Sequence, residues 1–261
     1  MANKSIIVGS APISADLAQA DLSGYQKIAV NKSWRLRNDF DAHVFLKSLD
    51  GADKPRATPG MASVGVEKFS PILNTAGGIF LTSGSVTMIA GYWAVTHSRA
   101  KFVSFHGCDL VFDAGPDGQT HYYGDGDEGP LMGNFQYNLR QEQRSLRLFI
   151  WALMHRTVLT NSSALPGTKL CFPVVPLNTE DPSMFGAISA TKEYAALVRA
   201  GGNALAYEAE NRTPMFYRKQ KLFEADQASL DAMDRMMDQW EDCRPLVNDF
   251  NDRLATMIAA Q

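Results

Sequence analysis

Short runs of apolar residues, separated by polar and glycine-containing stretches, fill the first 180 residues of the chain. Such continuous runs are typical of strands that are buried on both faces, as in a parallel sheet. The first run, Ser5 to Gly9, ends in a glycine, which suits an abrupt exit from a strand. The pattern predicts six strands, at residues 5–9, 27–31, 43–46, 78–82, 101–106 and 157–160.

Two of the stretches between these strands have the pattern of helices. Residues 85–98 follow the predicted strand 78–82 directly and are themselves followed by the strand 101–106. This order forms a βαβ unit, which implies parallel strands joined by a right-handed crossover. A longer helix is expected within residues 135–155. We therefore expect an α/β fold with a mostly parallel sheet flanked by helices.

Two connections rich in Gly and Pro interrupt this alternation. Residues 51–76 predict a long irregular connection, which in a compact domain is often functional. Residues 113–134 contain six Gly and two Pro, so no regular helix is expected there. Ligands in open α/β sheets bind outside the carboxyl ends of the strands. Because this second connection follows the strand 101–106, it is the first place to look for chemistry.

The pattern beyond Pro182 changes and becomes helical. A helix is expected at residues 190–200, ended by Gly201, Gly202 and Asn203. In residues 225–260, apolar side chains recur every three or four positions, at Leu230, Met233, Met237 and Trp240. Pro245 interrupts this repeat, so two helices or one kinked helix are expected.

This change in pattern predicts two parts of the chain. We expect a sheet-containing domain over residues 1–180 and a helical cap over residues 181–261. The cap would pack on the sheet or on another copy of the chain, in a homo-oligomer. A Met-rich surface that binds a partner is the alternative.

Composition and charge narrow the class of protein. The 261 residues carry 25 Lys and Arg against 28 Asp and Glu, so no basic excess favours nucleic acid. The three cysteines are too few and too scattered for a disulfide framework or a zinc knuckle. No apolar run reaches the length of a signal peptide or of a membrane span, about 7–15 and about 20 residues. We expect a cytoplasmic protein with no membrane span.

Small and polar residues follow the first two predicted strands and open the helix after the fourth. Gly9 and Ser10 follow the first strand, where a nucleotide phosphate or a sugar would meet the chain. Asn31 closes the second strand, and its amide offers donors and an acceptor to a ribose, a base or a sugar. Ser83 and Gly84 precede the helix, where backbone N–H groups can face an anion. The structural alternatives are a tight strand exit, a turn and a helix cap.

A dense polar cluster follows the fifth predicted strand. It comprises Asp109, His121, Tyr122, Tyr123, Asp125, Asp127 and Glu128. A histidine or a carboxylate can serve as a general base, and the carboxylates can hold a divalent cation. A solvated acidic loop is the third alternative. Asn161 and Ser162 follow the sixth strand, either as a polar binding pair or as turn formers.

The order of these motifs is more specific than any one of them. Along the chain they read Gly9-Ser10-Ala11-Pro12, Asn31, Thr82-Ser83-Gly84, Gly107-Cys108-Asp109, His121-Tyr122-Tyr123-Gly124 and Asn161-Ser162. This series resembles the bacterial sialyltransferases of glycosyltransferase family 42. It also resembles the related motility accessory factor and 6-hydroxymethylpterin pyrophosphokinase-like proteins. The resemblance spans residues 5–165 and is best over residues 78–124.

The resemblance implies a Rossmann-like domain that binds a cytidine-monophosphate sugar. It makes Asp109 a structural or site-facing carboxylate. Asp125 stands where the family has its general-base histidine, and Leu110, Val111 and Phe112 replace the family's phosphate-binding tyrosines. These departures imply nucleotide-sugar chemistry with an altered donor or acceptor. The residues that the resemblance places around the nucleotide are Gly9, Ser10, Asn31, Ser83, Gly84, Asn161 and Ser162.

In the implied mechanism, Asp125 or His121 removes a proton from an acceptor hydroxyl, which attacks the anomeric carbon of the donor sugar. Tyr122 or Tyr123, with the helix N-terminus at residues 83–84, stabilises the departing phosphate, and no metal is required. One alternative is a pyrophosphokinase-like transferase whose loop 125–128 binds Mg²⁺ and a nucleoside triphosphate. The other is a non-catalytic nucleotide-binding or assembly protein. The sequence identifies neither the donor sugar nor the acceptor.

Overall fold

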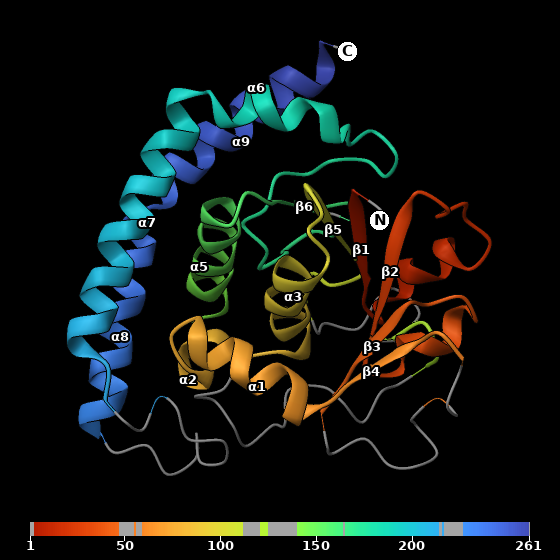
Figure 1. Cartoon of the computed structure of the whole chain (residues 1–261), viewed down its shortest axis with the longest axis horizontal. Helices are drawn as coiled ribbons and strands as arrows, with labels where there is room; N and C mark the ends of the chain where they lie inside the picture. The colour runs from red at the N-terminus through yellow and green to blue at the C-terminus, as the bar shows by residue number, and fades with distance from the viewer. Residues whose placement is uncertain are drawn as a thin grey trace.

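A computed structural model describes residues 3–46, 55, 59–111, 121–124, 140–163, 165–213, 216 and 227–260. Its centre is a sheet of six parallel strands in the order β4-β3-β2-β1-β5-β6 (Figure 1). The strands are β1 (Lys4–Val8), β2 (Tyr25–Val30), β3 (Ala42–Val44), β4 (Ala62–Val64), β5 (Phe102–His106) and β6 (Val158–Asn161). The expected α/β fold with a parallel sheet is confirmed.

β1 lies in the middle of the sheet and pairs with β2 on one side and β5 on the other. Ile7 stands opposite Ile28 in β2 and Phe105 in β5. The apolar run of β1 is continuous because neighbouring residues point to opposite faces and both faces are covered. All three residues from Ile6 to Val8 are fully buried.

The side chains of β1 alternate between two hydrophobic cores. Ile7 belongs to the larger core, together with α3 (Val86–His97) and α5 (Gln141–Met154). Ile6 and Val8 belong to a smaller core with the 3₁₀ segments η1 (Pro12–Leu17) and η2 (Asn31–Leu36). From β1 to β4 the chain steps along the sheet in one direction, and it then returns past β1 to β5 and β6. Right-handed crossovers put these two sets of connections on opposite faces.

Two expectations for residues 51–82 are wrong. Residues 78–82 do not form a strand, because they enter the short helix α2 (Ile79–Thr82), which packs against α1, α3 and α5. A short apolar run does not distinguish a buried strand from a buried helical turn. The predicted irregular connection 51–76 contains a strand that the pattern does not predict, β4, and the helix α1 (Val66–Thr75).

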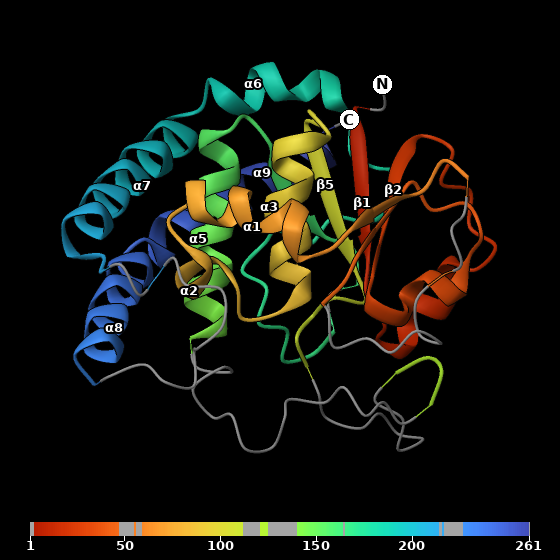
Figure 2. The same cartoon turned by 60° about the horizontal axis from the view of Figure 1, so that its bottom comes forward.

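The helical C-terminal segment is confirmed, and it forms an outer layer of the molecule (Figures 1 and 2). After η4 (Pro182–Met184) and α6 (Phe185–Ser189), the helices α7 (Lys192–Asn211) and α8 (Gln227–Glu241) pack on α5. α9 (Arg244–Ala259) packs on α7. The two helices expected within residues 225–260 are therefore present, and Pro245 lies in the first turn of α9. No helix in the described ranges is both long and apolar enough to cross a membrane.

The helix break expected at residues 201–203 is wrong, because α7 continues through it to Asn211. Gly201 faces α5 at very short range. A Cβ atom at Gly201 would lie 2.4 Å from Cγ2 of Ile150 and 3.1 Å from Sδ of Met154. This glycine therefore permits the close approach of two helices and does not end one.

A fully buried ion pair joins the outer helices to the layer beneath them. Arg147 in α5 donates through Nε and Nη2 to the two carboxylate oxygens of Glu208 in α7, at 2.7 and 2.8 Å. Its Nη1 donates to the hydroxyl of Tyr92 in α3 at 2.6 Å. Nε1 of Trp240 in α8 donates to Glu208 Oε1, also at 2.6 Å. One pair of charges thus connects four helices.

Candidate functional site

The carboxyl ends of β1 and β5 lie side by side where the strand order reverses (Figure 2). The N–H of Gly9 donates to the carbonyl of His106 at 2.8 Å, and a Cβ at Gly9 would lie 2.1 Å from the carbonyl oxygen of Gly107. Gly107 has a φ of +63°, and its Cβ would lie 1.8 Å from Oγ of Ser14. Only glycine fits at either position. This reversal is the place where open α/β sheets bind ligands.

Asp109 is the centre of a buried polar cluster beside this point. Its Oδ1 accepts from Nδ2 of Asn161 at 2.8 Å and from the N–H of Leu165 at 3.1 Å. Its Oδ2 accepts from Oγ of Ser163, whose N–H donates to Oδ1 of Asn161 at 3.0 Å. With only 2 % of its surface exposed, Asp109 holds the exits of β5 and β6 together. Of the two roles expected for this carboxylate, its hydrogen bonds support the structural one.

Ser162 and His106 tie the exit of β6 to the connection after β1. Nδ1 of His106 lies 3.1 Å from Oγ of Ser162, and Nε2 lies 3.3 Å from the carbonyl oxygen of Ile13. Burial lowers the pKa of His106, partly opposed by the Ile13 carbonyl and by the charges of Asp16 and Asp109. A neutral imidazole at neutral pH suits a positioning role between the two loops.

Cys108 lies between Gly107 and Asp109 in the sequence, and its thiol is not a nucleophile. Its thiol is buried and lies 3.7 Å from the carbonyl oxygen of Ile7, to which it donates. Burial, with a smaller contribution from the charge of Asp109, raises its pKa to about 12. The thiolate, which is the reactive form, is therefore not populated at neutral pH.

The His-Tyr-Tyr-Gly segment forms a tight turn that spans the exits of β1 and β2. His121 and Gly124 exchange backbone hydrogen bonds at 3.2 and 3.0 Å. The N–H of Tyr122 donates to the carbonyl of Ser10 at 3.0 Å, and its hydroxyl donates to the carbonyl of Lys32 at 3.1 Å. The structure therefore brings Ser10, His121 and Tyr122 together.

The side chains of this turn are packed and partly withdrawn from water. The imidazole of His121 is buried and stacks on the ring of Tyr123, with centroids 5.0 Å apart. Burial raises the pKa of Tyr122 to about 12, so its hydroxyl stays protonated and acts as a donor. Asp125, the expected base, lies outside the described residues, as do Asp127 and Glu128.

Asn31 offers an acceptor to a ligand at the same sheet edge. It has a φ of +49°, a left-handed conformation that asparagine adopts more readily than most residues. Its carbonyl accepts from Nε2 of His43 at 2.5 Å. Its side-chain Oδ1 is buried and has no hydrogen-bond partner among the described residues. A buried acceptor of this kind is costly unless a donor satisfies it.

Ser83 and Gly84 are buried against α5. Nη1 of Arg144 donates to the carbonyl of Ser83 at 2.5 Å, and Nε2 of Gln141 donates to the carbonyl of Gly84 at 2.8 Å. The next residue, Ser85, caps α3 by accepting from the N–H of Met88 at 3.1 Å. The contacts in this segment support its structural alternative, a helix cap.

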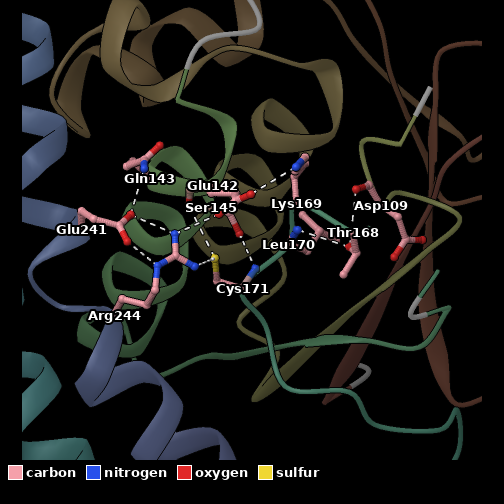
Figure 3. A network of polar contacts seen from close by, with 10 residues as sticks. All are labelled: Asp109, Glu142, Gln143, Ser145, Thr168, Lys169, Leu170, Cys171, Glu241 and Arg244. Carbon is pink, nitrogen blue, oxygen red and sulfur yellow. Dashed lines mark hydrogen bonds and ion pairs between the residues drawn. The ribbon is translucent and has the colours of Figure 1, made fainter. Parts of the chain in front are cut away.

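Sequence reasoning missed the segment that supports the Asp109 cluster from the other side. The N–H of Lys169 donates to the carbonyl of Asp109 at 2.9 Å, and Oγ1 of Thr168 donates to it at 3.4 Å (Figure 3). The N–H of Cys171 then donates to Oγ of Ser145 in α5 at 2.8 Å. No motif marks residues 168–171, because their partners are distant in sequence.

The same network reaches the corner between α8 and α9. Nη2 of Arg244 lies 3.1 Å from Oε2 of Glu142 and 2.8 Å from Oε2 of Glu241 (Figure 3). Nζ of Lys169 binds the other oxygen of Glu142 at 3.2 Å. The exit of β5 is thus connected through α5 to the C-terminal helices.

The fold and the sheet edge together define an α/β protein with a candidate ligand site at its strand reversal. Comparisons with protein-family models, with curated proteins and with solved structures find no match to this chain. Within the described ranges, no group of three or more His, Cys, Asp or Glu side chains is arranged to hold a metal ion.

Proposed function

We propose that the chain is a glycosyltransferase that moves a sugar from a nucleotide-activated donor, of the CMP-sugar type, to a hydroxyl acceptor. The observation that carries this proposal is the meeting of Gly9, Gly107 and the Asp109 cluster at the strand reversal. The two glycines let the exits of β1 and β5 pack directly against each other at the strand reversal, where open α/β sheets bind ligands. The resemblance to glycosyltransferase family 42 supplies the choice of donor.

In this proposal the exits of β1, β2 and β6 bind the nucleotide. Oδ1 of Asn31 accepts a hydrogen bond from the donor, which would satisfy its buried oxygen. Asn161 and Ser162 shape the far wall, held in place by Asp109 and His106. These side chains orient the donor and need no charge of their own.

In the proposed transfer, the polar groups of the turn at residues 121–124 and Asp125 after it each have one role. Asp125, or His121, accepts the proton of the acceptor hydroxyl as its oxygen bonds to the anomeric carbon. The bond from that carbon to the phosphate oxygen breaks, and the electron pair leaves with the nucleotide. The hydroxyl of Tyr123, or that of Tyr122 after it leaves the carbonyl of Lys32, donates to the phosphate as its charge increases, a role that a protonated phenol can fill.

We also propose that this reaction takes place in the cytoplasm. All three cysteines, Cys108, Cys171 and Cys243, are free thiols, and two of them are buried. Free thiols persist in a reducing compartment.

A thermal-shift panel of CMP, CDP, UDP, GDP and ATP, with and without Mg²⁺, tests the proposal. At a concentration about 100 times Kd, a nucleotide that binds only the native state stabilises it by about 2.7 kcal/mol. That stabilisation raises the Tm by several degrees for a chain of this size. We expect cytidine nucleotides to do so without metal. The Asn31→Ala variant should lose most of the shift, while Asn248→Ala, an exposed position on α9, should keep it.

The alternatives give different results in the same panel. Stabilisation by ATP that requires Mg²⁺ would support the pyrophosphokinase-like transferase instead. Stabilisation by a nucleotide, without transfer from the corresponding nucleotide sugar to water or to any acceptor tested, would support a binding protein. If no nucleotide shifts the Tm, the proposed function is wrong.

A further inference from the structure

His43 is a buried histidine to which the proposed reaction gives no role. It stands in the middle of β3, opposite Ala29 in β2, with 1 % of its surface exposed. Its imidazole stacks on the ring of Phe45, with centroids 4.9 Å apart. Burying a polar ring this deeply is costly unless its nitrogens find hydrogen-bond partners. One such partner lies at the exit of β2.

The imidazole of His43 reaches the backbone of Asn31, the first residue after β2. Its Nε2 lies 2.5 Å from the carbonyl oxygen of Asn31. A carbonyl oxygen can only accept a hydrogen bond, so Nε2 must carry the hydrogen. The contact therefore fixes His43 as a donor at Nε2.

This hydrogen bond holds a residue in an unfavourable backbone conformation. Asn31 has a φ of +49°, in the left-handed region that costs free energy for residues with a Cβ, although asparagine tolerates it better than most. Such conformations persist only where the surroundings determine them, and they are frequent at ligand sites. The donor on His43 is one of the contacts that determine this conformation.

Ser33 restrains the exit of β2 from the other side. Its hydroxyl accepts from the N–H of Val30 at 2.8 Å and donates to the carbonyl of Val8 in β1 at 2.7 Å. The exit is thus tied to β1 through Ser33 and to β3 through His43. With its backbone held from both neighbouring strands, Asn31 has only the torsions of its own side chain with which to meet a ligand.

We propose that His43 is a positioning residue of the nucleotide site, whose Nε2–H holds the backbone of Asn31 so that Oδ1 is presented to the nucleotide. This inference rests on the proposed function, in which Oδ1 of Asn31 accepts a hydrogen bond from the nucleotide. His43 does not touch the nucleotide in this role, so its loss weakens binding only through Asn31. Holding a binding group in place raises affinity because less motion is lost when the ligand binds.

The position of the hydrogen on His43 can be measured without any ligand. Nitrogen NMR of the histidine rings should show a hydrogen on Nε2 of His43, with the signals assigned by their absence in His43→Gln. A ring that carries its only hydrogen on Nδ1 would overturn the inference, whichever nucleotide binds.

Three substitutions separate the hydrogen bond from the packing of the ring. His43→Gln keeps an N–H donor near the position of Nε2, His43→Met has a chain of similar length without a donor, and His43→Phe keeps a ring without a donor. Titration calorimetry with CMP measures Kd for each variant that circular dichroism shows to be folded. His43→Gln should bind within about twofold of the wild type, and the two variants without a donor about tenfold more weakly.

His97→Gln is the matched control, because it makes the same substitution at an exposed position at the end of α3. It should bind CMP as the wild type does. The inference is overturned if His43→Met and His43→Phe bind like the wild type, or if His43→Gln binds as weakly as they do. Either of the two variants without a donor is sufficient for this comparison, and the NMR measurement needs neither.

The same substitutions in an Asn31→Ala background show whether the effect passes through Asn31. There, His43→Met should change Kd by less than about twofold, because the side chain that His43 positions is absent. A tenfold effect in both backgrounds would show that His43 acts by another route and would contradict the inference.

The outcomes distinguish this inference from the proposed function. If the wild type binds no nucleotide, the proposed function is wrong and the positioning role is lost with it. If the wild type binds CMP and the variants without a donor bind it equally well, the proposed function stands and only the positioning role is wrong. A lower Tm without a change in Kd would show that His43 serves the fold alone.

Discussion

Gly107 meets two constraints at once, which makes it the most restricted residue of the candidate site. Its positive φ is disfavoured for residues with a Cβ, and the space where a Cβ would stand is filled by the hydroxyl of Ser14. Gly9 has an ordinary φ and is restricted only by the backbone of Gly107. The sequence predicts a tight strand exit at Gly9, whereas the contact between the two loops requires the parallel register of β1 and β5.

Asp125 is the residue that we expect to take the acceptor proton. A carboxylate has an unperturbed pKa of about 4, so it is ionised at neutral pH but needs its pKa raised to act well as a base. Asp125→Asn should lower turnover about 100-fold or more and leave nucleotide affinity nearly unchanged, measured by initial rates and by thermal shift.

The neighbouring Asp127→Asn is the matched control, and it should lose much less activity. His121→Ala tests the competing base and should also cost less than Asp125→Asn. Full activity in Asp125→Asn, with none in His121→Ala, would reverse the two roles. If both variants remain fully active, this loop is not the catalytic centre.

Among the elements, strands that are buried on both faces could be predicted from the sequence, and the edge strand could not. β1 and β5 are mainly apolar, and β5 is buried along its whole length, because both faces of these strands are covered. β4 has only three residues, two of them exposed, and its backbone pairing with β3 leaves no trace in the hydrophobic pattern. Short edge strands are of this kind in many sheets. The pattern predicts a strand where α2 lies, because this single helical turn is as apolar as a buried strand.

The residues of the candidate site also divide into those that the sequence predicts and those that only the fold brings together. Polar residues that end parallel strands can be predicted to lie at one edge, which is how Gly9, Asn31 and Asn161 are found. Thr168 and Lys169 lie in no regular element, and only the fold brings them to the carbonyl of Asp109. Their role depends on tertiary contacts that a local pattern does not encode.

Alanine substitutions at the two adjacent glycines of α7, Gly201 and Gly202, should change the stability of the protein in opposite directions. Gly202→Ala should stabilise the protein by about 0.5–1 kcal/mol, because alanine favours a helix and a Cβ there meets nothing within 4 Å. Gly201→Ala should destabilise it, because the new Cβ would overlap Cγ2 of Ile150. Urea unfolding of the two variants measures both effects. Stabilisation of similar size by both would show that α7 does not approach α5 as closely as described.

In the whole molecule, the C-terminal helices and the sheet layer share one core. The larger hydrophobic cluster contains residues of β1, α3 and α5 together with Trp240 and Phe250 of α8 and α9. The buried pair of Arg147 and Glu208 lies within this shared region. Such an arrangement predicts that residues 1–180 and 181–261 unfold together, although the change in sequence pattern suggests two parts.

Glu208→Gln tests this coupling. It leaves the guanidinium of Arg147 buried without its counter-charge, and removing one partner of a buried ion pair costs about 3–5 kcal/mol. Glu210→Gln, at an exposed position of the same helix, should change the stability by less than about 0.5 kcal/mol. Urea unfolding should be followed by far-ultraviolet circular dichroism and by Trp240 fluorescence, in a background in which Trp34, Trp93 and Trp151 are replaced by phenylalanine. Because one core spans the sheet layer and the outer helices, both signals should shift together in Glu208→Gln. A first transition that includes the whole change in Trp240 fluorescence and only part of the change in circular dichroism, followed by a second at the original urea concentration, would instead show that residues 181–261 are an independent cap.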